Sequence, residues 1–148
     1  FYLIKVSPIG YNLQVTAKLL FNMIFTIGAI LITTITSFLF TDLNAIVILL
    51  AGLMAIILSI GHICHSFDMD LQNPILQWYD NSEITLMSKS TTKSMIYALV
   101  LSLLMFVITT LGGKVGIIIC IIISLIYLFS RIHLLRIRVY YYFNHLEV

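Results

Sequence analysis

The fold of this chain is decided by residues 19–40, which read LLFNMIFTIGAILITTITSFLF and contain no charged side chain. A helix of these 22 residues is about 33 Å long at about 1.5 Å per residue, and the hydrocarbon layer of a bilayer is about 30 Å thick. The run therefore predicts a transmembrane helix.

The composition of the whole chain agrees with a membrane protein. Of its 148 residues, 61% are apolar and only 9% are charged, whereas soluble domains average about 25% charged residues. A soluble domain of this length buries only about 70% of its surface, so large apolar patches would remain in water. A soluble globular enzyme is therefore excluded. The net charge of +2 is too small for a disordered or nucleic-acid-binding chain.

Charged residues divide the chain into four apolar segments. They predict transmembrane helices at residues 19–40, 43–63, 94–111 and 115–135. The fourth uncharged run is short, but Lys114 and Arg131 at its ends can extend their charged groups to the two interfaces. The stretch 64–93 contains four of the six acidic residues, so we expect a loop there. The expected fold is all-α, a polytopic membrane protein with four transmembrane helices.

The distribution of Lys and Arg predicts the orientation, because cytoplasmic segments are enriched in these residues. With four spans, residues 1–18, the loop 64–93 and the tail 136–148 share one side of the membrane. These segments contain six of the eight Lys and Arg residues, Arg131 lies at the same end of the fourth span, and only Lys114 belongs to the other side. We therefore expect both ends and the long loop in the cytoplasm, and a multi-pass protein of the plasma membrane. The chain begins at Phe1 rather than Met, as expected for part of a longer protein.

Small and polar side chains follow one face of the first predicted helix. Asn22, Thr26, Ala29, Thr33 and Ser37 lie within about 80° of one another at about 100° per residue. In lipid, helices approach each other closely where side chains are small, because apolar area alone does not drive them together. Two interpretations stay open for this stripe: helix packing, or the lining of a substrate pathway or subunit interface.

One cluster contains the residue types of a zinc site: His62, Cys64 and His65, followed by Asp68 and Asp70. On a helix the two histidines share a face that excludes the cysteine. The aspartates fall where the chain leaves the membrane. We therefore expect an interfacial helix end with solvated aspartates, and no metal or other cofactor.

No pattern of catalytic residues is present. Gly113-Lys114 is similar to the end of a P-loop, but Ile108 and Val115 stand where a Gly and a Ser or Thr are required. The sequence offers neither a nucleophile–base pattern nor an acid inside a span. The chain is predicted to be non-catalytic, so energy for uphill transport would come from another subunit.

Two segments on the predicted cytoplasmic side carry further signals. Ser7-Pro8 is typical of a helix start, with Ser as N-cap and Pro in the first turn, and it predicts a helix over residues 9–20 that leads into the first span. In the long loop, Asn73-Pro74 favours extended chain, and Trp78 is typical of a membrane interface.

These segments, KVSPIGYNLQVTAKLL (5–20) and DLQNPILQWYDNSEI (70–84), resemble the permeases of ABC-2 type exporters, particularly an ABC exporter family of Gram-positive bacteria. The resemblance implies that the first segment couples the permease to an ABC ATPase subunit, and that the second is a loop between two pairs of spans. It also implies a permease dimer surrounded by membrane lipid. The implied coupling residues are Ser7, Pro8, Tyr11 and Leu13, and the implied loop residues are Asp70, Pro74, Trp78 and Glu83.

The sequence thus leads to the hypothesis of a permease segment of an ATP-driven exporter, with no nucleic-acid partner. Asn22, Thr26, Thr33 and Ser37 are its candidate pathway or interface residues. Two alternatives remain: an ion-coupled or facilitative transporter, and a non-transporting membrane scaffold.

Overall fold

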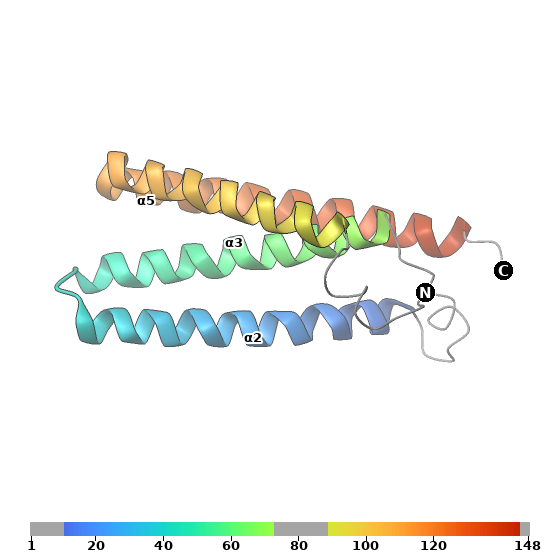
Figure 1. Cartoon of the computed structure of the whole chain (residues 1–148), viewed down its shortest axis with the longest axis horizontal. Helices are drawn as coiled ribbons and strands as arrows, with labels where there is room; N and C mark the ends of the chain where they lie inside the picture. The colour runs from blue at the N-terminus through green and yellow to red at the C-terminus, as the bar shows by residue number, and fades with distance from the viewer. Residues whose placement is uncertain (1–10, 73–88, 146–148) are drawn as a thin grey trace.

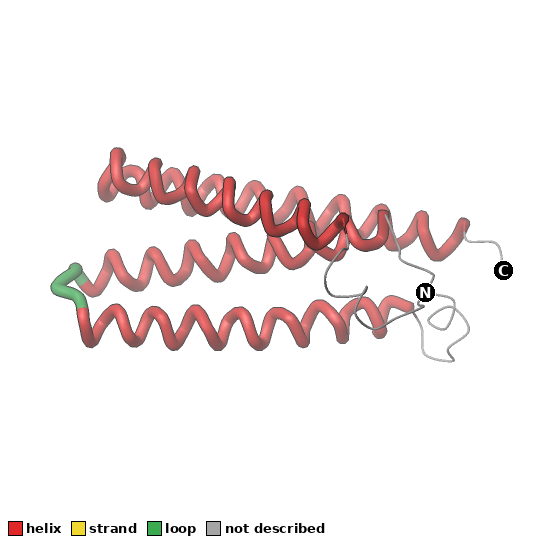
Figure 2. The backbone as a smooth tube through the Cα atoms, viewed as in Figure 1, coloured by secondary structure: helices red, strands yellow, loops and turns green. Residues whose placement is uncertain are grey.

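The computed structural model describes residues 11–72 and 89–145, and within these residues the chain is helical except at residues 41–44. Helix α2 spans Tyr11–Phe40, α3 spans Ala45–Gln72 and α5 spans Lys89–His145. The helices lie along one long axis, as Figure 1 shows, and a short connection joins α2 to the antiparallel α3 (green in Figure 2). Asn44 caps α3, because its side-chain oxygen accepts a hydrogen bond from the backbone N–H of Ile46 at 2.9 Å.

Helix α5 folds back on itself at Gly113, where the backbone leaves helical geometry with φ 54° and ψ −130°. We call residues 89–112 its first arm and residues 114–145 its second arm. Glycine suits this position because it adopts a positive φ without steric cost. The arms touch just beyond the fold: a Cβ added at Gly116 would lie 2.3 Å from the carbonyl oxygen of Ile108. Figure 1 shows the two arms running side by side in opposite directions.

Helix α3 lies at the centre of the packing, with its most extensive contacts to α5 and further contacts to α2. Its last turns form a core with the second arm, built from Cys64, Leu71, Leu135 and Val139. Side chains of α2, among them Leu19, pack against this core. The end of the bundle where α2 begins and α5 ends is therefore the part in which all the helices meet.

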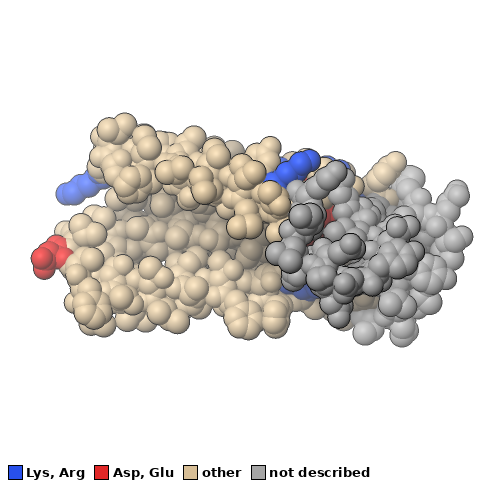
Figure 3. Space-filling model, in the orientation of Figure 1, with Lys and Arg blue, Asp and Glu red and all other residues tan. Residues whose placement is uncertain are grey.

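The outer surface of the bundle is apolar between its two ends. Phe21, Ile24, Phe106 and Phe129, for example, are each more than 60% exposed. In Figure 3, charged side chains lie at one end of the molecule and beside the grey residues, and a wide band between these two groups carries none. Helices α2, α3 and α5 are each long and apolar enough to cross a membrane. The protein is thus all-α, with three helices suited to a bilayer.

The helices extend further than the predicted spans. Helix α3 continues to Gln72, and α5 begins at Lys89 and reaches His145, so the predicted loop 64–93 is helical at both of its ends and the predicted tail 136–148 is mostly helical. Asp68 and Asp70, two of the four acidic residues that suggested a loop, have partners on α5 and lie within α3. The predicted helix over residues 9–20 is described from Tyr11 onward, as the unbroken start of α2.

Candidate functional site

The predicted coupling and loop residues are described only in part. Ser7, Pro8, Pro74, Trp78 and Glu83 lie outside the described residues. Tyr11 begins α2, and Leu13, in the first turn, is 67% exposed. Asp70 is exposed in the last turns of α3, and its Oδ1 accepts a hydrogen bond from the Ser90 hydroxyl at 2.6 Å. This contact joins α3 to the start of α5.

The hydroxyl groups of the α2 stripe are bonded to their own helix. Thr26 donates to the carbonyl of Asn22 at 2.9 Å, Thr33 to Ala29 at 2.8 Å, and Ser37 to Thr33 at 2.9 Å. Such bonds satisfy a hydroxyl without any partner on another helix. The stripe is therefore less polar towards its surroundings than its composition suggests.

The stripe nevertheless lines hollows shared with α3. Asn22 and Thr26 border a cavity of about 340 Å³ together with His62. Thr33 and Ser37 border a second cavity, of about 270 Å³, opposite small residues of α3: Ala51, Gly52 and Ala55. These four stripe residues thus lie along the α2–α3 interface, where both interpretations of the stripe remain possible.

Thr34 was missed as a contact residue by the sequence reasoning. A Cβ added at Gly52 would lie 2.8 Å from the Thr34 Oγ1 atom, so α2 and α3 approach each other closely at this point. The sequence contains a patch of small residues on α3 and a pair of threonines on α2, but it does not show that the two face each other. Only the rotation of the two helices, set by the fold, selects Thr34 rather than Thr33 for the closest contact.

Two histidines of α3 contact α5, His62 on the first arm and His65 on both arms. His62 Nε2 is 3.2 Å from the Ser94 hydroxyl, which is itself buried. The ring of His65 meets the edge of Tyr97 on the first arm, with centroids 5.2 Å apart, and approaches Tyr127 on the second arm at 6.5 Å. Within the described part of the chain, neither ring nitrogen of His65 has a hydrogen-bond partner.

Asp68 is the most deeply buried carboxylate of the described residues, at 4% exposure. It forms an ion pair with Arg138 of the second arm, and its Oδ2 accepts a hydrogen bond from Gln72 Nε2 at 3.0 Å. A buried carboxylate is costly unless it is paired. This finding corrects the expectation of solvated aspartates at the end of α3: Asp70 is exposed, but Asp68 is enclosed because Arg138 approaches from α5.

The residue types of a zinc site do not converge. Across residues 11–72 and 89–145, no three His, Cys, Asp or Glu side chains are placed to hold a metal ion. Cys64 is a buried free thiol that borders a cavity towards α2 and the second arm of α5. His65 lies towards Tyr97 of the first arm, and His62 contacts Ser94 while also bordering the cavity with Asn22 and Thr26.

The contacts of His62, His65, Asp68 and Asp70 define one polar cluster between α3 and α5. Its partners Ser94, Tyr97, Tyr127 and Arg138 were not anticipated, because each is remote in sequence and unremarkable in its local context. The local signal is that Arg131 and Arg138, seven residues apart, lie on one face of the helix that follows the last uncharged run.

Comparisons with protein-family models, with curated proteins and with solved structures gave no match. The class that fold and site define is therefore a coarse one: an all-α protein with membrane-length apolar helices, joined at one end by a polar cluster.

Proposed function

We propose that this chain is a membrane-spanning permease subunit, or the C-terminal part of one, of an ATP-driven ABC exporter. The subunit is non-catalytic and works as a dimer in the plasma membrane, with ATP hydrolysis on a separate ABC ATPase subunit. Residues 19–40, 43–63, 94–111 and 115–135 cross the bilayer, and both ends are cytoplasmic.

Four crossings are supported by the fold of α5 and by the positions of charge. Because α5 reverses at Gly113, its two arms provide two crossings. The first arm is uncharged between Lys93 and Lys114, and the second between Lys114 and Arg131. Asp42 and Lys114 then mark the outer surface, and the remaining described charges mark the cytoplasmic one.

The observation that carries the coupling proposal is the continuity of α2. This helix runs without interruption from Tyr11 to Phe40, so residues 11–20 of the segment that resembles an ABC-2 coupling element are continuous with the first crossing. A flexible linker would absorb a push from an ATPase, whereas a continuous helix passes it on as tilt. The hollows between α2 and α3 leave room for such a tilt.

In this proposal Ser7, Pro8, Tyr11 and Leu13 contact the ATPase, with Tyr11 and Leu13 as the apolar anchors. Asn22, Thr26, Thr33 and Ser37 line the path or interface that changes when α2 tilts. Asp70, Pro74, Trp78 and Glu83 belong to the cytoplasmic connection between the two pairs of crossings.

A double variant, Tyr11→Ala with Leu13→Ala, tests the coupling role in the full-length permease. It is expected to insert normally but to lose the copurifying ATPase, since buried apolar anchors each contribute about 2 kcal/mol or more to such contacts. The matched control is Phe21→Ala with Ile24→Ala, which removes exposed apolar side chains from the membrane part of the same helix. Equal ATPase recovery from both double variants would contradict the proposal, and no ATPase recovery even with the unmodified chain would favour a membrane scaffold.

An ion-coupled or facilitative transporter is the second candidate, and the buried ionisable side chains favour it. His65 is buried without a hydrogen-bond partner among the described residues, and Asp68 is buried in an ion pair. In this candidate the second crossing extends beyond residue 63, since α3 is long and apolar enough to cross a membrane over Ala45–Gln72, and both side chains then lie inside the bundle, where ionisable groups often belong to ion or proton pathways. Proton flux into liposomes that contain only this chain, driven by a potassium potential and abolished by His65→Gln, would support this candidate. The exporter proposal expects no such flux.

A further inference from the structure

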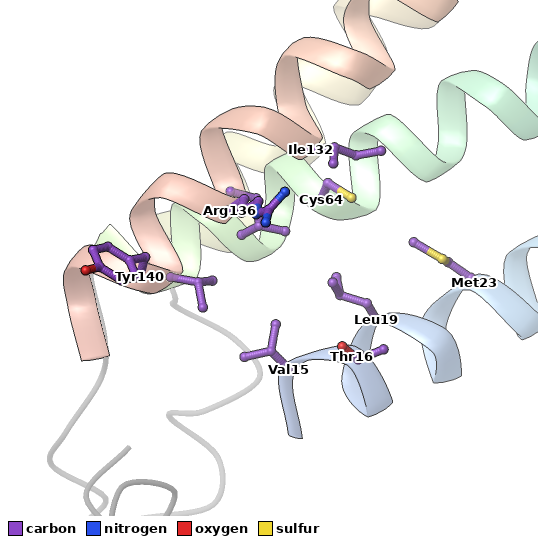
Figure 4. Close-up of a pocket in the computed structure, with 10 residues that line it drawn as sticks. Val15, Thr16, Leu19, Met23, Cys64, Ile132, Arg136 and Tyr140 are labelled. Carbon is purple, nitrogen blue, oxygen red and sulfur yellow. The ribbon is translucent and has the colours of Figure 1, made fainter. Parts of the chain in front are cut away.

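A groove separates α2 from the second arm of α5 near the end of the bundle where the two helices approach. It encloses about 440 Å³, within the range of about 300–1,000 Å³ found for ligand sites. Figure 4 shows Val15, Leu19 and Met23 of α2 facing Ile132, Arg136 and Tyr140 of α5 across this space. The groove exists because α2 packs on α3, while its contacts with α5 are slight.

The wall of the groove changes from apolar to polar along the helix axis. Met23 and Ile132 lie deepest towards the uncharged band, and Leu19 and Leu135 follow. Arg136 and Tyr140 lie towards the end of α5. Both follow the uncharged run of the second arm, which ends at Ser130. A ligand that fits this wall has an apolar part towards the uncharged band and a polar head towards the end of α5. A lipid in the bilayer has its acyl chains and its head in the same arrangement.

The polar end of the groove is positively charged. Arg136 lines the groove and is exposed. Among residues 11–72 and 89–145, the arginine of the second arm that forms an ion pair with Asp68 is Arg138 and not Arg136. A head that carries negative charge complements Arg136, and anionic lipids are held by such basic residues at membrane surfaces.

We propose that this groove binds one anionic phospholipid of the surrounding bilayer. Its acyl chain lies along Leu19, Met23 and Ile132, and its phosphate accepts hydrogen bonds from the Arg136 guanidinium. The Tyr140 ring, one turn beyond Arg136, lies beside the head, at the level where aromatic rings gather at membrane interfaces. The inference rests on the membrane insertion proposed above, and it is independent of any ATPase partner.

Native mass spectrometry of the full chain, released from micelles with equal amounts of phosphatidylglycerol and phosphatidylcholine, tests this site. We expect one retained lipid per chain, with phosphatidylglycerol favoured about fivefold, the effect of one basic residue near the head. Arg136→Gln should bring the two lipids to equal retention, whereas Lys114→Gln, which removes a charge at the opposite end, should leave the preference unchanged. Met23→Trp should reduce retention of both lipids by filling the apolar part of the groove.

Several results would overturn the site. A preference that persists in Arg136→Gln, or that falls equally in Lys114→Gln, would show that general surface charge attracts the lipid. Displacement of phosphatidylglycerol by glycerol phosphate alone would show that the acyl chain is not bound. A dimer that excludes lipid from the unmodified chain and separates in Met23→Trp would assign the groove to a second copy. Far-ultraviolet circular dichroism verifies that each variant has the helix content of the unmodified chain. Loss of the phosphatidylglycerol preference in Arg136→Gln with intact helix content supports the site.

Discussion

The polar cluster is built residue by residue from contacts between distant parts of the chain. Asp68 is enclosed because Arg138 lies beside it, His62 contacts Ser94, and Asp70 contacts Ser90. From the sequence alone, the aspartates were expected in water and the histidines at the interface. Residue types and spacing do not reveal which remote side chain will satisfy a given polar group, and the burial of Asp68 was therefore beyond sequence reasoning.

Removing one partner of the Asp68–Arg138 pair should cost more stability than removing both. Arg138→Met leaves the carboxylate buried and unpaired, and we expect a loss of about 1–3 kcal/mol in the free energy of unfolding, moderated because Arg138 is partly exposed. The double variant Asp68→Asn with Arg138→Met should recover part of this loss. Denaturant titration of the purified chain in detergent measures both. A double variant less stable than Arg138→Met would contradict the assignment of the pair.

At the scale of elements, the charge spacing predicted the helices well and their ends poorly. The uncharged runs indicated α2, the apolar part of α3 and both arms of α5, because side chains in lipid must be apolar whatever their neighbours are. The ends extend beyond these runs because a helix continues while its polar side chains find partners, as Asp68 does with Gln72 and Arg138. The stripe on α2 was found from periodicity alone, and its orientation towards α3 required the structure.

The close contact between the arms of α5 depends on Gly116. A Cβ at this position would lie 2.3 Å from a backbone carbonyl, whereas a Cβ at Gly112 would meet nothing within 4 Å. We expect Gly116→Ala to destabilise the chain by about 1–3 kcal/mol, as overpacking does in tight cores, and Gly112→Ala to be neutral or slightly stabilising, since Ala favours helix. Thermal unfolding in detergent compares the two variants. Similar melting temperatures for both would show that the arms do not pack as described.

For the whole molecule, the apolar exterior and the reversal of α5 support one account of how the chain lies in a membrane. The runs 19–41, 43–67, 94–113 and 115–130 contain no charged residue, and on the face drawn in Figure 3 a charge-free band separates two groups of charged side chains. The coupling proposal and the lipid site both place the polar end in or near the cytoplasm. Neither the direction of insertion nor the partner follows from the fold itself, because a helical bundle has the same packing in either orientation.

Cysteine labelling in intact cells tests this account most directly. In a chain whose Cys64 and Cys120 are replaced by Ala, single cysteines at Asp42, Lys114, Lys93 and Tyr141 are exposed to a reagent that does not cross the membrane. All four positions are exposed in the structure, and Gly113 itself is left unchanged. We predict that Asp42→Cys and Lys114→Cys are labelled from outside, and that Lys93→Cys and Tyr141→Cys are labelled only after the cells are opened. The reverse pattern, or Asp42→Cys and Lys114→Cys on opposite sides, would contradict four crossings with cytoplasmic ends and the coupling proposal that depends on them.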